Sequence, residues 1–292
     1  MVLFFTCKIK VAMFLTKEKL DFFRRDGFLV LEDFVSIESC ESLRERAIEI
    51  VENFDHSECS PIFTTREQTR NSDSYFLSSG DKISCFFEEE AFNSKGELKQ
   101  SKLFSINKIG HAMHDLDPVF EKFSRTNNLE KITNELGFKD PKILQSMFIF
   151  KQPFIGGEVI CHQDSTFLYT RPLSVNGFWF ALEDSSIENG CLWAIPGGHK
   201  KGLKSRFFRK KDGEGTEMEI FDDSPWEISK LVPLEVRTGT MIVLHGSLPH
   251  MSYANRSKRT RHAYTMHLIE GGSYYPKSNW LQRPSGMPLR GF

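Results

Sequence analysis

Residues 157–170, GEVICHQDSTFLYT, are the stretch on which the interpretation of the whole chain depends. Its run of β-type residues predicts a strand. Side chains two residues apart on a strand point to the same face, so His162 and Asp164 would project together while Cys161 and Gln163 face away. One face would then present an imidazole and a carboxylate, two ligand types of a metal site. The motif alone is weak, because a solvated turn or a buried polar pair would look the same.

Similar short apolar runs precede and follow this stretch, separated by glycine, proline, asparagine and aspartate. Regularly spaced short strands with such breaks are typical of a double-sheet barrel or sandwich. We therefore predict a mainly β fold whose core occupies residues 141–292, interrupted by a charged insertion at residues 200–230. The runs are KILQSMFIFKQ, GEVICHQDSTFLYT, NGFWFALED, CLWAIPG, TMIVLHG and RHAYTMHLIE.

The first half of the chain carries helical patterns instead. Thr16 is a candidate N-cap of a helix that stops at Gly27, and Ser36 is the candidate cap of a second, longer helix. Residues 117–137 give two further helical pieces. Residues 16–140 are therefore expected to form a helical flank and lid over the β core.

Residues 75–88, YFLSSGDKISCFFE, resemble a hairpin around a Ser-Gly-Asp turn. The sequence has no internal repeat and no linker, so we predict one domain over residues 1–292. Residues 1–15 are expected to be a disordered extension, and a translation start at Met13 is left open.

Composition excludes several classes of function. The chain has 38 basic and 39 acidic residues, which predicts neither a nucleic-acid surface nor a polybasic membrane anchor. The apolar N-terminal stretch is broken by Lys8 and Lys10 and is too short to span a bilayer. Six scattered cysteines without a CxxC pair indicate reduced thiols rather than a disulfide framework or zinc site. We expect a cytoplasmic protein, a monomer or weak oligomer, with a small-molecule substrate.

A third metal ligand must come from another strand. Residues 240–252, TMIVLHGSLPHMS, offer His245 and His250, whose odd spacing places them on opposite faces of a continuous strand. The residues alone do not decide between them. Arg261 follows a polar, turn-like segment, and a hairpin there would return it to the side of His250.

Two histidines, one carboxylate and an arginine together suggest a specific chemistry. Two histidines and a carboxylate are the facial triad of non-haem Fe(II) oxygenases, which leaves coordination positions open. A guanidinium group holds a carboxylate through two parallel hydrogen bonds, as a dicarboxylate co-substrate requires. The combination is far more specific than any of its parts.

The chain also resembles the phytanoyl-CoA dioxygenase family, over nearly its whole length from about residue 16. The resemblance implies a double-stranded β-helix core, a jelly roll of the cupin-like type, that uses Fe(II), 2-oxoglutarate and O2. The stretches that carry it are RDGFLVLEDF, YFLSSGDKI, SINKIGHAMHDLDPVF, QSMFIFKQP, GGEVICHQDSTFLYT, ENGCLWAIPGGHK and RHAYTMHLIE.

The same resemblance assigns roles to particular residues. It matches the iron ligands to His162, Asp164 and His250, which favours His250 over His245. It matches Arg261 to the anchor of the 2-oxoglutarate carboxylate. Four further positions match the lining of the co-substrate pocket, namely Lys108, Met147, Trp179 and Ser252.

The function expected from these features is hydroxylation of a small organic or acyl substrate, with release of succinate and CO2 and with ascorbate as a supporting reductant. The carboxylate of Asp164 favours hydroxylation over halogenation, which would need a smaller residue there. The alternatives are a non-catalytic metal- and 2-oxoglutarate-binding jelly-roll module and a cupin-like isomerase, in which Arg261 would have no purpose.

Whether the substrate is a CoA thioester stays open. The basic and aromatic segment KSRFFRKKDGEG, residues 204–215, could bind its phosphates, and a solvated loop is the simpler interpretation.

Overall fold

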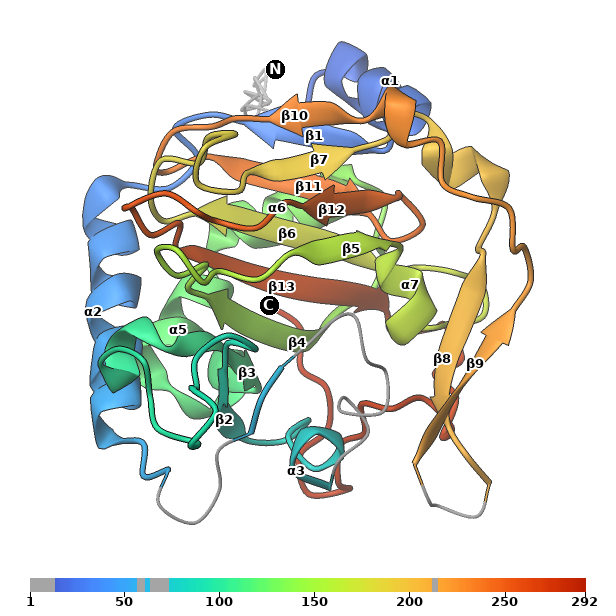
Figure 1. Ribbon diagram of the computed structural model, residues 1–292. Helices are drawn as coiled ribbons and strands as arrows, with labels where there is room; N and C mark the ends of the chain where they lie inside the picture. Colours follow the sequence, from blue (N-terminus) through green and yellow to red (C-terminus); the bar gives the residue numbers. More distant parts are fainter. Residues whose placement is uncertain (1–13, 57–60, 64–73, 212–214) are drawn as a thin grey trace, which may run out of the picture.

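The computed structural model describes residues 14–56, 61–63, 74–211 and 215–292. It is mainly β, with a large and a small antiparallel sheet, a separate hairpin, and helices against one face of the large sheet (Figure 1). The disordered extension expected over residues 1–15 falls mostly on residues 1–13, which lie outside the described residues.

The large sheet joins strands from both halves of the chain. All its strand pairs are antiparallel. Its spatial order is β1 (Phe28–Leu31), β11 (Met241–His245), β6 (Asn176–Ala181), β13 (Ala263–Glu270), β4 (Pro141–Ile149), β3 (Ile106–His111) and β2 (Ile83–Phe87).

The small sheet is antiparallel too and comes from the second half of the chain. Its order is β10 (Val232–Leu234), β7 (Leu192–Ala194), β12 (His250–Ser252) and β5 (Val159–His162). A separate hairpin, β8 (Ser205–Arg209) and β9 (Thr216–Ile220), projects from the side of the molecule (Figure 1).

Helix termini follow the predicted caps. The Thr16 side chain accepts a hydrogen bond from Lys19 N, and the Ser36 side chain accepts one from Ser39 N. Gly27 ends the first helix with φ of 85°, a left-handed conformation that glycine adopts without strain. The helices are α1 (Lys17–Asp26), α2 (Ile37–Asn53), α3 (Ser74–Leu77), α4 (Met113–Leu116), α5 (Pro118–Ser124), α6 (Asn127–Glu135) and α7 (Asp164–Phe167), with short 3₁₀ turns at η2 (Lys102–Phe104), η3 (Gly198–Lys201) and η4 (Ile228–Lys230).

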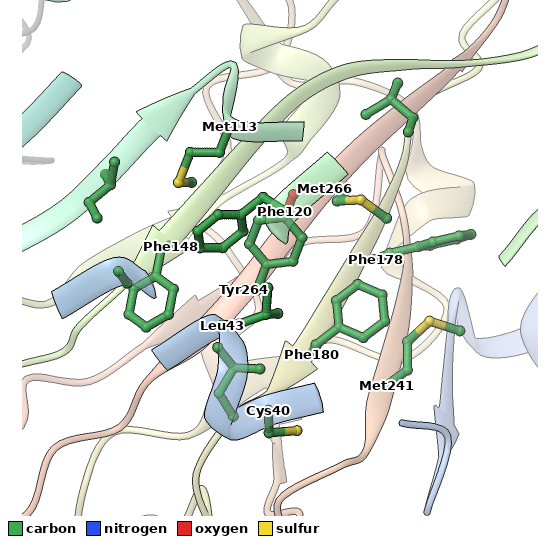
Figure 2. Close-up of a cluster of buried hydrophobic side chains, with 14 of the residues drawn as sticks. Cys40, Leu43, Met113, Phe120, Phe148, Phe178, Phe180, Met241, Tyr264 and Met266 are labelled. Carbon is green, nitrogen blue, oxygen red and sulfur yellow. The ribbon is translucent and has the colours of Figure 1, made fainter. Parts of the chain in front are cut away.

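The main hydrophobic core lies between the helices and one face of the large sheet. Side chains from α2 and α5 pack there against alternate residues of β4, β6 and β13. Tyr264 also donates or accepts a hydrogen bond with Ser124 of α5, with the two hydroxyl oxygens 2.7 Å apart. Figure 2 shows this cluster, labelled at Cys40, Leu43, Met113, Phe120, Phe148, Phe178, Phe180, Met241, Tyr264 and Met266.

The opposite face of the large sheet looks toward the small sheet. Trp179, Ala181 and Ile242 from the large sheet share a second core cluster with Leu192 and Ala194 from the small one. The two sheets therefore pack face to face, as the alternating pattern of the second half predicts.

Two local expectations differ from the structure. Residues 75–88 form α3 and β2 rather than a hairpin, because Ser79 Oγ donates to the Phe76 carbonyl and closes a helical turn. The region 16–140 also contributes β1, β2 and β3 to the large sheet, so the helical flank and the β core share one sheet.

The charged insertion is also more ordered than a solvated loop. Arg206 Nη2 donates to Ser278 Oγ at 2.7 Å, and Arg209 Nε donates to the Trp280 carbonyl at 2.8 Å. These bonds fasten the β8–β9 hairpin to the C-terminal segment of the chain. The described cysteines, Cys40, Cys85, Cys161 and Cys191, are free thiols. Among the helices that the structure describes, none combines the length and apolar character needed to cross a membrane.

Candidate metal centre and co-substrate pocket

Three side chains from separate elements meet at one point between the sheets. His162 ends β5, Asp164 begins α7, and His250 begins β12 directly opposite His162. Each offers one ligand atom, and these atoms all lie within 4.8 Å of one another. Asp164 Oδ1 is 3.6 Å from Nε2 of each histidine. The predicted grouping is therefore present, although Asp164 reaches it from a helical turn and not from the strand.

Backbone carbonyls fix which nitrogen each histidine presents to this point. Nδ1 of His162 donates to the Ile160 carbonyl at 2.8 Å, and Nδ1 of His250 donates to the Leu248 carbonyl at 2.9 Å. A neutral imidazole that uses Nδ1–H in this way carries its lone pair on Nε2. Both Nε2 atoms are thus set to act as metal ligands.

The electrostatics favour an ionised carboxylate at Asp164 and a neutral imidazole at His250. Burial by itself would raise the pKa of Asp164, but His267 and His250 hold the pKa of this carboxyl well below its usual value. Burial lowers the pKa of His250 to about 4, against the opposing effect of Asp164. The ionised Asp164, together with the Nε2 atoms that the carbonyl contacts direct at the same point, suits a divalent cation.

His267 is a neighbour of the centre that the sequence analysis did not identify. Its Nε2 lies 3.3 Å from Asp164 Oδ2, and its Nδ1 lies 3.1 Å from Gln145 Nε2. The amide nitrogen of Gln145 can only donate, so His267 Nδ1 accepts. The proton of the neutral ring is then on Nε2, which faces Asp164. A Cβ on Gly177 would lie 3.1 Å from Asp164 Oδ2, so this glycine leaves room for the carboxylate.

The spacing of residues along the sequence could have identified His267. It stands six residues after Arg261, and an even separation on one strand places two side chains on the same face. Gln145 has the same relation to Met147 on β4. These spacings in the sequence were the available indication that His267 and Gln145 lie near the site.

Arg261 lies just before β13 and is fully enclosed, with 2% of its surface exposed. Its Nε donates to the Gly190 carbonyl at 3.2 Å, and its guanidinium carbon lies 5.3 Å from the centre of the Trp179 ring. Nη1 has no hydrogen-bond partner within the described part of the chain. Burial lowers the pKa of Arg261 to about 10, so it stays charged at neutral pH. A buried cation with an unpaired donor fits a carboxylate ligand.

Ser252 lies two residues after the ligand His250 and is buried. Its Oγ accepts a hydrogen bond of 2.8 Å from Nζ of Lys151, another residue that the sequence analysis did not single out. The Lys151–Ser252 bond links the end of β4 to β12 across 101 residues of sequence.

Trp179 and Met147 face the same interior space. Both stand opposite Thr265 of the central strand β13. Met147 stays half-buried although strands flank it on both sides, so its side chain keeps access to solvent inside the sandwich. Trp179 is buried under the Arg261 guanidinium.

Lys108 belongs to β3, farther from the centre of the sheet. Its ammonium nitrogen lies 3.2 Å from the centre of the Phe63 ring, with the Phe76 and Phe86 rings also near it. Burial lowers the pKa of Lys108 to about 7. Its role in the co-substrate pocket stays a prediction.

His245 is the alternative that the residues alone left open, and it lies elsewhere. It ends β11, with its ring 4.9 Å from that of His199 and 6.3 Å from that of Phe23 in α1. The metal-binding group of described residues contains His250 and not His245.

The residues present fit both an iron ion and a dicarboxylate. Two imidazoles and one carboxylate whose ligand atoms lie within 4.8 Å of one another match the ligand types of a facial Fe(II) site. The unpaired Nη1 of Arg261 matches the distal carboxylate of a 2-oxoglutarate molecule.

Comparison with known proteins identifies the family of this chain. The sequence model of the family described as Phytanoyl-CoA dioxygenase (PhyH) matches residues 23–263. A curated relative from Arabidopsis thaliana, "Phytanoyl-CoA dioxygenase", is 47% identical over 273 residues, covering 92% of this chain and 94% of the relative. "Phytanoyl-CoA dioxygenase domain-containing protein 1" of Mus musculus is 44% identical over 284 residues, covering 94% and 97%.

A solved structure of lower sequence identity shares the fold. EctD from S. alaskensis, crystallised with 2-oxoglutarate and 5-hydroxyectoine, superposes with a TM-score of 0.63 at 18% identity, covering 94% of this chain and 86% of that one. The same protein has been solved with bound Fe. From the family match over residues 23–263 and the two close relatives, the chain belongs to the phytanoyl-CoA dioxygenase family.

Proposed function

We propose that this protein is an Fe(II)- and 2-oxoglutarate-dependent dioxygenase that hydroxylates a small organic or acyl substrate. The observation that carries the proposal is the pairing of two features in one interior space. One is the cluster of His162, Asp164 and His250; the other is the buried Arg261 with its unpaired Nη1. A metal site of another class would have no use for this arginine.

In this proposal the two sheets form the double-stranded β-helix core that family membership implies. His162, Asp164 and His250 hold Fe(II) through two Nε2 atoms and one carboxylate oxygen. Bound Fe(II), with 2-oxoglutarate and O2, supplies the oxidation that places a hydroxyl group on a C–H bond, with release of succinate and CO2.

The chain's own residues orient and shield the reactants. Arg261 pairs with the distal carboxylate of 2-oxoglutarate, while Ser252 and Trp179 border the same subsite. His267 holds the second oxygen of Asp164, which keeps the first oxygen directed at the metal. Met147 and Lys108 line the space on the side of β4 and β3.

The substrate is proposed only as a small organic or acyl molecule. Two arginines of the basic insertion, Arg206 and Arg209, already bind the C-terminal segment. These bonds weigh against their use for CoA phosphates.

Anaerobic absorption spectroscopy tests the proposal. The purified protein is titrated with Fe(II) and 2-oxoglutarate beside His162→Ala and Arg261→Ala. The matched controls are His245→Ala, a histidine outside the centre, and Arg259→Ala, an exposed arginine. We expect a charge-transfer band that needs both additions, disappears in His162→Ala, and needs about 10- to 100-fold more 2-oxoglutarate in Arg261→Ala.

The controls should give the wild-type band. No band in a folded wild-type protein would rule out the dioxygenase. A band without succinate release from any substrate tested, and without slow uncoupled turnover, would instead favour the non-catalytic binding module.

A further inference from the structure

Lys151 is buried where a lysine is seldom found. Only 2% of its surface is exposed, and it lies two residues after the end of β4. Its ammonium group donates to the Gly157 carbonyl at 2.6 Å and to Ser252 Oγ at 2.8 Å. Lysine side chains normally keep the ammonium in water, so this placement calls for a cause.

The backbone of Lys151 is held in an unfavourable conformation that points the side chain inward. Its φ is 44°, in the left-handed region that residues with a Cβ rarely adopt. Asn255 Nδ2 donates to the Lys151 carbonyl at 2.9 Å, and the backbone of Asn255 pairs with Gly156. Such strain persists only where the surroundings over-determine it, and it is found most often at functional sites.

Lys151 and Arg261 approach the same place from two sides of Gly190. Arg261 Nε binds the Gly190 carbonyl, while a Cβ on Gly190 would lie 2.7 Å from Cε of Lys151. Glu88 is also buried here and accepts the Gly157 N–H at 3.0 Å; burial and the Arg261 charge lower the pKa of Lys151 to about 7, and the Glu88 carboxylate opposes them. Gly157 thus lies between the two charges: its N–H binds Glu88 and its carbonyl binds Lys151.

The bond from Lys151 determines what the Ser252 hydroxyl can do. A hydroxyl has one proton to donate, and its oxygen accepts from neighbours. With the Lys151 ammonium donating to Oγ, the Ser252 proton is free to turn toward an anion in the interior. A hydroxyl that both accepts from a cation and donates to an anion is polarised in the direction that strengthens the second bond.

We infer that Lys151 is a positioning residue of the 2-oxoglutarate subsite, acting through Ser252 by orienting its hydroxyl as a donor to the distal carboxylate that Arg261 binds. The inference rests on the proposed function. It adds a second basic residue to the recognition of the co-substrate, one that acts through the Ser252 hydroxyl.

A double-mutant cycle separates this role from a merely structural one. The variants are Lys151→Met, Ser252→Ala and the double variant, with the exposed Lys139→Met as the matched control. Calorimetry measures 2-oxoglutarate binding to the Zn(II)-loaded protein, and a separate titration measures Zn(II) affinity. Both readouts are independent of turnover.

We expect each single variant to weaken 2-oxoglutarate binding about tenfold, since each removes one link of a hydrogen-bond chain to a charged group. The double variant should also lose about tenfold, rather than about a hundredfold, because coupled residues are non-additive. Zn(II) affinity and the Lys139→Met control should match wild type.

The opposite outcomes are distinct. Wild-type affinity in Lys151→Met, independent losses that multiply in the double variant, or an equal loss of Zn(II) affinity would each overturn the role of Lys151. If the wild-type protein itself does not bind 2-oxoglutarate, the proposed function fails instead.

Lys151→Met leaves a buried carbonyl unpaired, so it could fail to fold. In that case Lys151→Gln replaces it in the same cycle, because its amide can still donate to one partner. A loss of about threefold or more is expected with Ser252 present and none in the Ser252→Ala background. An equal loss in both backgrounds would overturn the inference.

Discussion

The two faces of strand β13 differ sharply although their residues alternate along one segment. Tyr264 and Met266 point to the helices (Figure 2), and both are fully buried in the apolar core, as is Leu268. Thr265 and His267 point between the sheets, where Thr265 stands opposite Met147 and Trp179, and His267 reaches Asp164. One strand therefore stabilises the fold with one face and builds the site with the other.

The contrast shows how the fold separates stability from function. On the helix face, closely packed apolar side chains are removed from water, and this burial stabilises the folded state. On the site face, polar atoms are left without partners among the described residues, such as Arg261 Nη1 and Trp179 Nε1. Unpaired buried groups cost free energy, so the site face depends on the stability that the helix face supplies.

The largest expected effect is on the site face. Asp164→Ala removes the one charged ligand of the centre. Mutating a residue that only supports a metal ligand already lowers metal affinity or activity by about 10- to 100-fold. Fe(II) affinity and succinate formation should therefore each fall by more than about 100-fold in this variant. The free energy of unfolding of the metal-free protein should also fall at neutral pH, because a carboxyl group whose pKa is lowered by folding stabilises the folded state in its ionised form. Urea unfolding beside a metal titration measures both, and retained iron binding would contradict the assignment.

The matching change on the helix face is Phe180→Ala. The ring is fully buried in the core between sheet and helices, so its loss should lower the free energy of unfolding by about 3–5 kcal/mol. Affinity of the folded fraction for 2-oxoglutarate should stay within about twofold of wild type. A loss of affinity comparable to that of Arg261→Ala would show that the two faces are coupled and not separable.

A smaller effect is expected at His267, which touches the centre without entering the ligand set. His267→Phe removes the Nε2 donor beside Asp164, and Fe(II) affinity should fall by about 10-fold. His267→Gln is the control, because its amide can still donate. If both variants bind Fe(II) like wild type, His267 is only a packing residue.

The smallest effect is a change in pH dependence on the helix face. Burial lowers the pKa of His262 from 6.5 to about 4, with Glu183 opposing. In the unfolded chain His262 takes up a proton near pH 6.5, which the folded protein resists until about pH 4. Stability should therefore fall as pH drops through this window.

His262→Gln should reduce the slope of unfolding free energy against pH by about 1.4 kcal/mol per pH unit, the equivalent of one proton. Urea unfolding with a chelator at several pH values between 7 and 5 measures the slope. The difference in slope between wild type and His262→Gln should be the same with and without added metal, since His262 is outside the metal centre. An unaltered slope would place the responsible proton on another histidine.

Much of the architecture could be predicted from local sequence. The caps at Thr16 and Ser36 and the stop at Gly27 are short-range signals, and the structure confirms them. Residues 75–88 were misjudged because a Ser-Gly-Asp turn suits a hairpin as well as the end of a helical turn. The mainly β character of the second half was predictable from its short β-type runs and from the glycine, proline, asparagine and aspartate between them.

The site divides in the same way. Sequence supplied His162, Asp164, Arg261 and, through the family resemblance, the choice of His250. The period of two in a strand also places Thr265 and His267 of β13 on one face. The sequence could not show which residues distant along the chain contact each other. Examples are His250, which stands opposite His162, and Lys151, which binds Ser252.

These contacts join segments about a hundred residues apart in sequence, and strand pairing and sheet packing over that distance depend on the whole core. The sequence by itself therefore determined which residue types the chemistry needs and where along the chain they stand. Only the tertiary structure decided which of them meet, because local sequence patterns do not specify which distant strand pairs with a given strand.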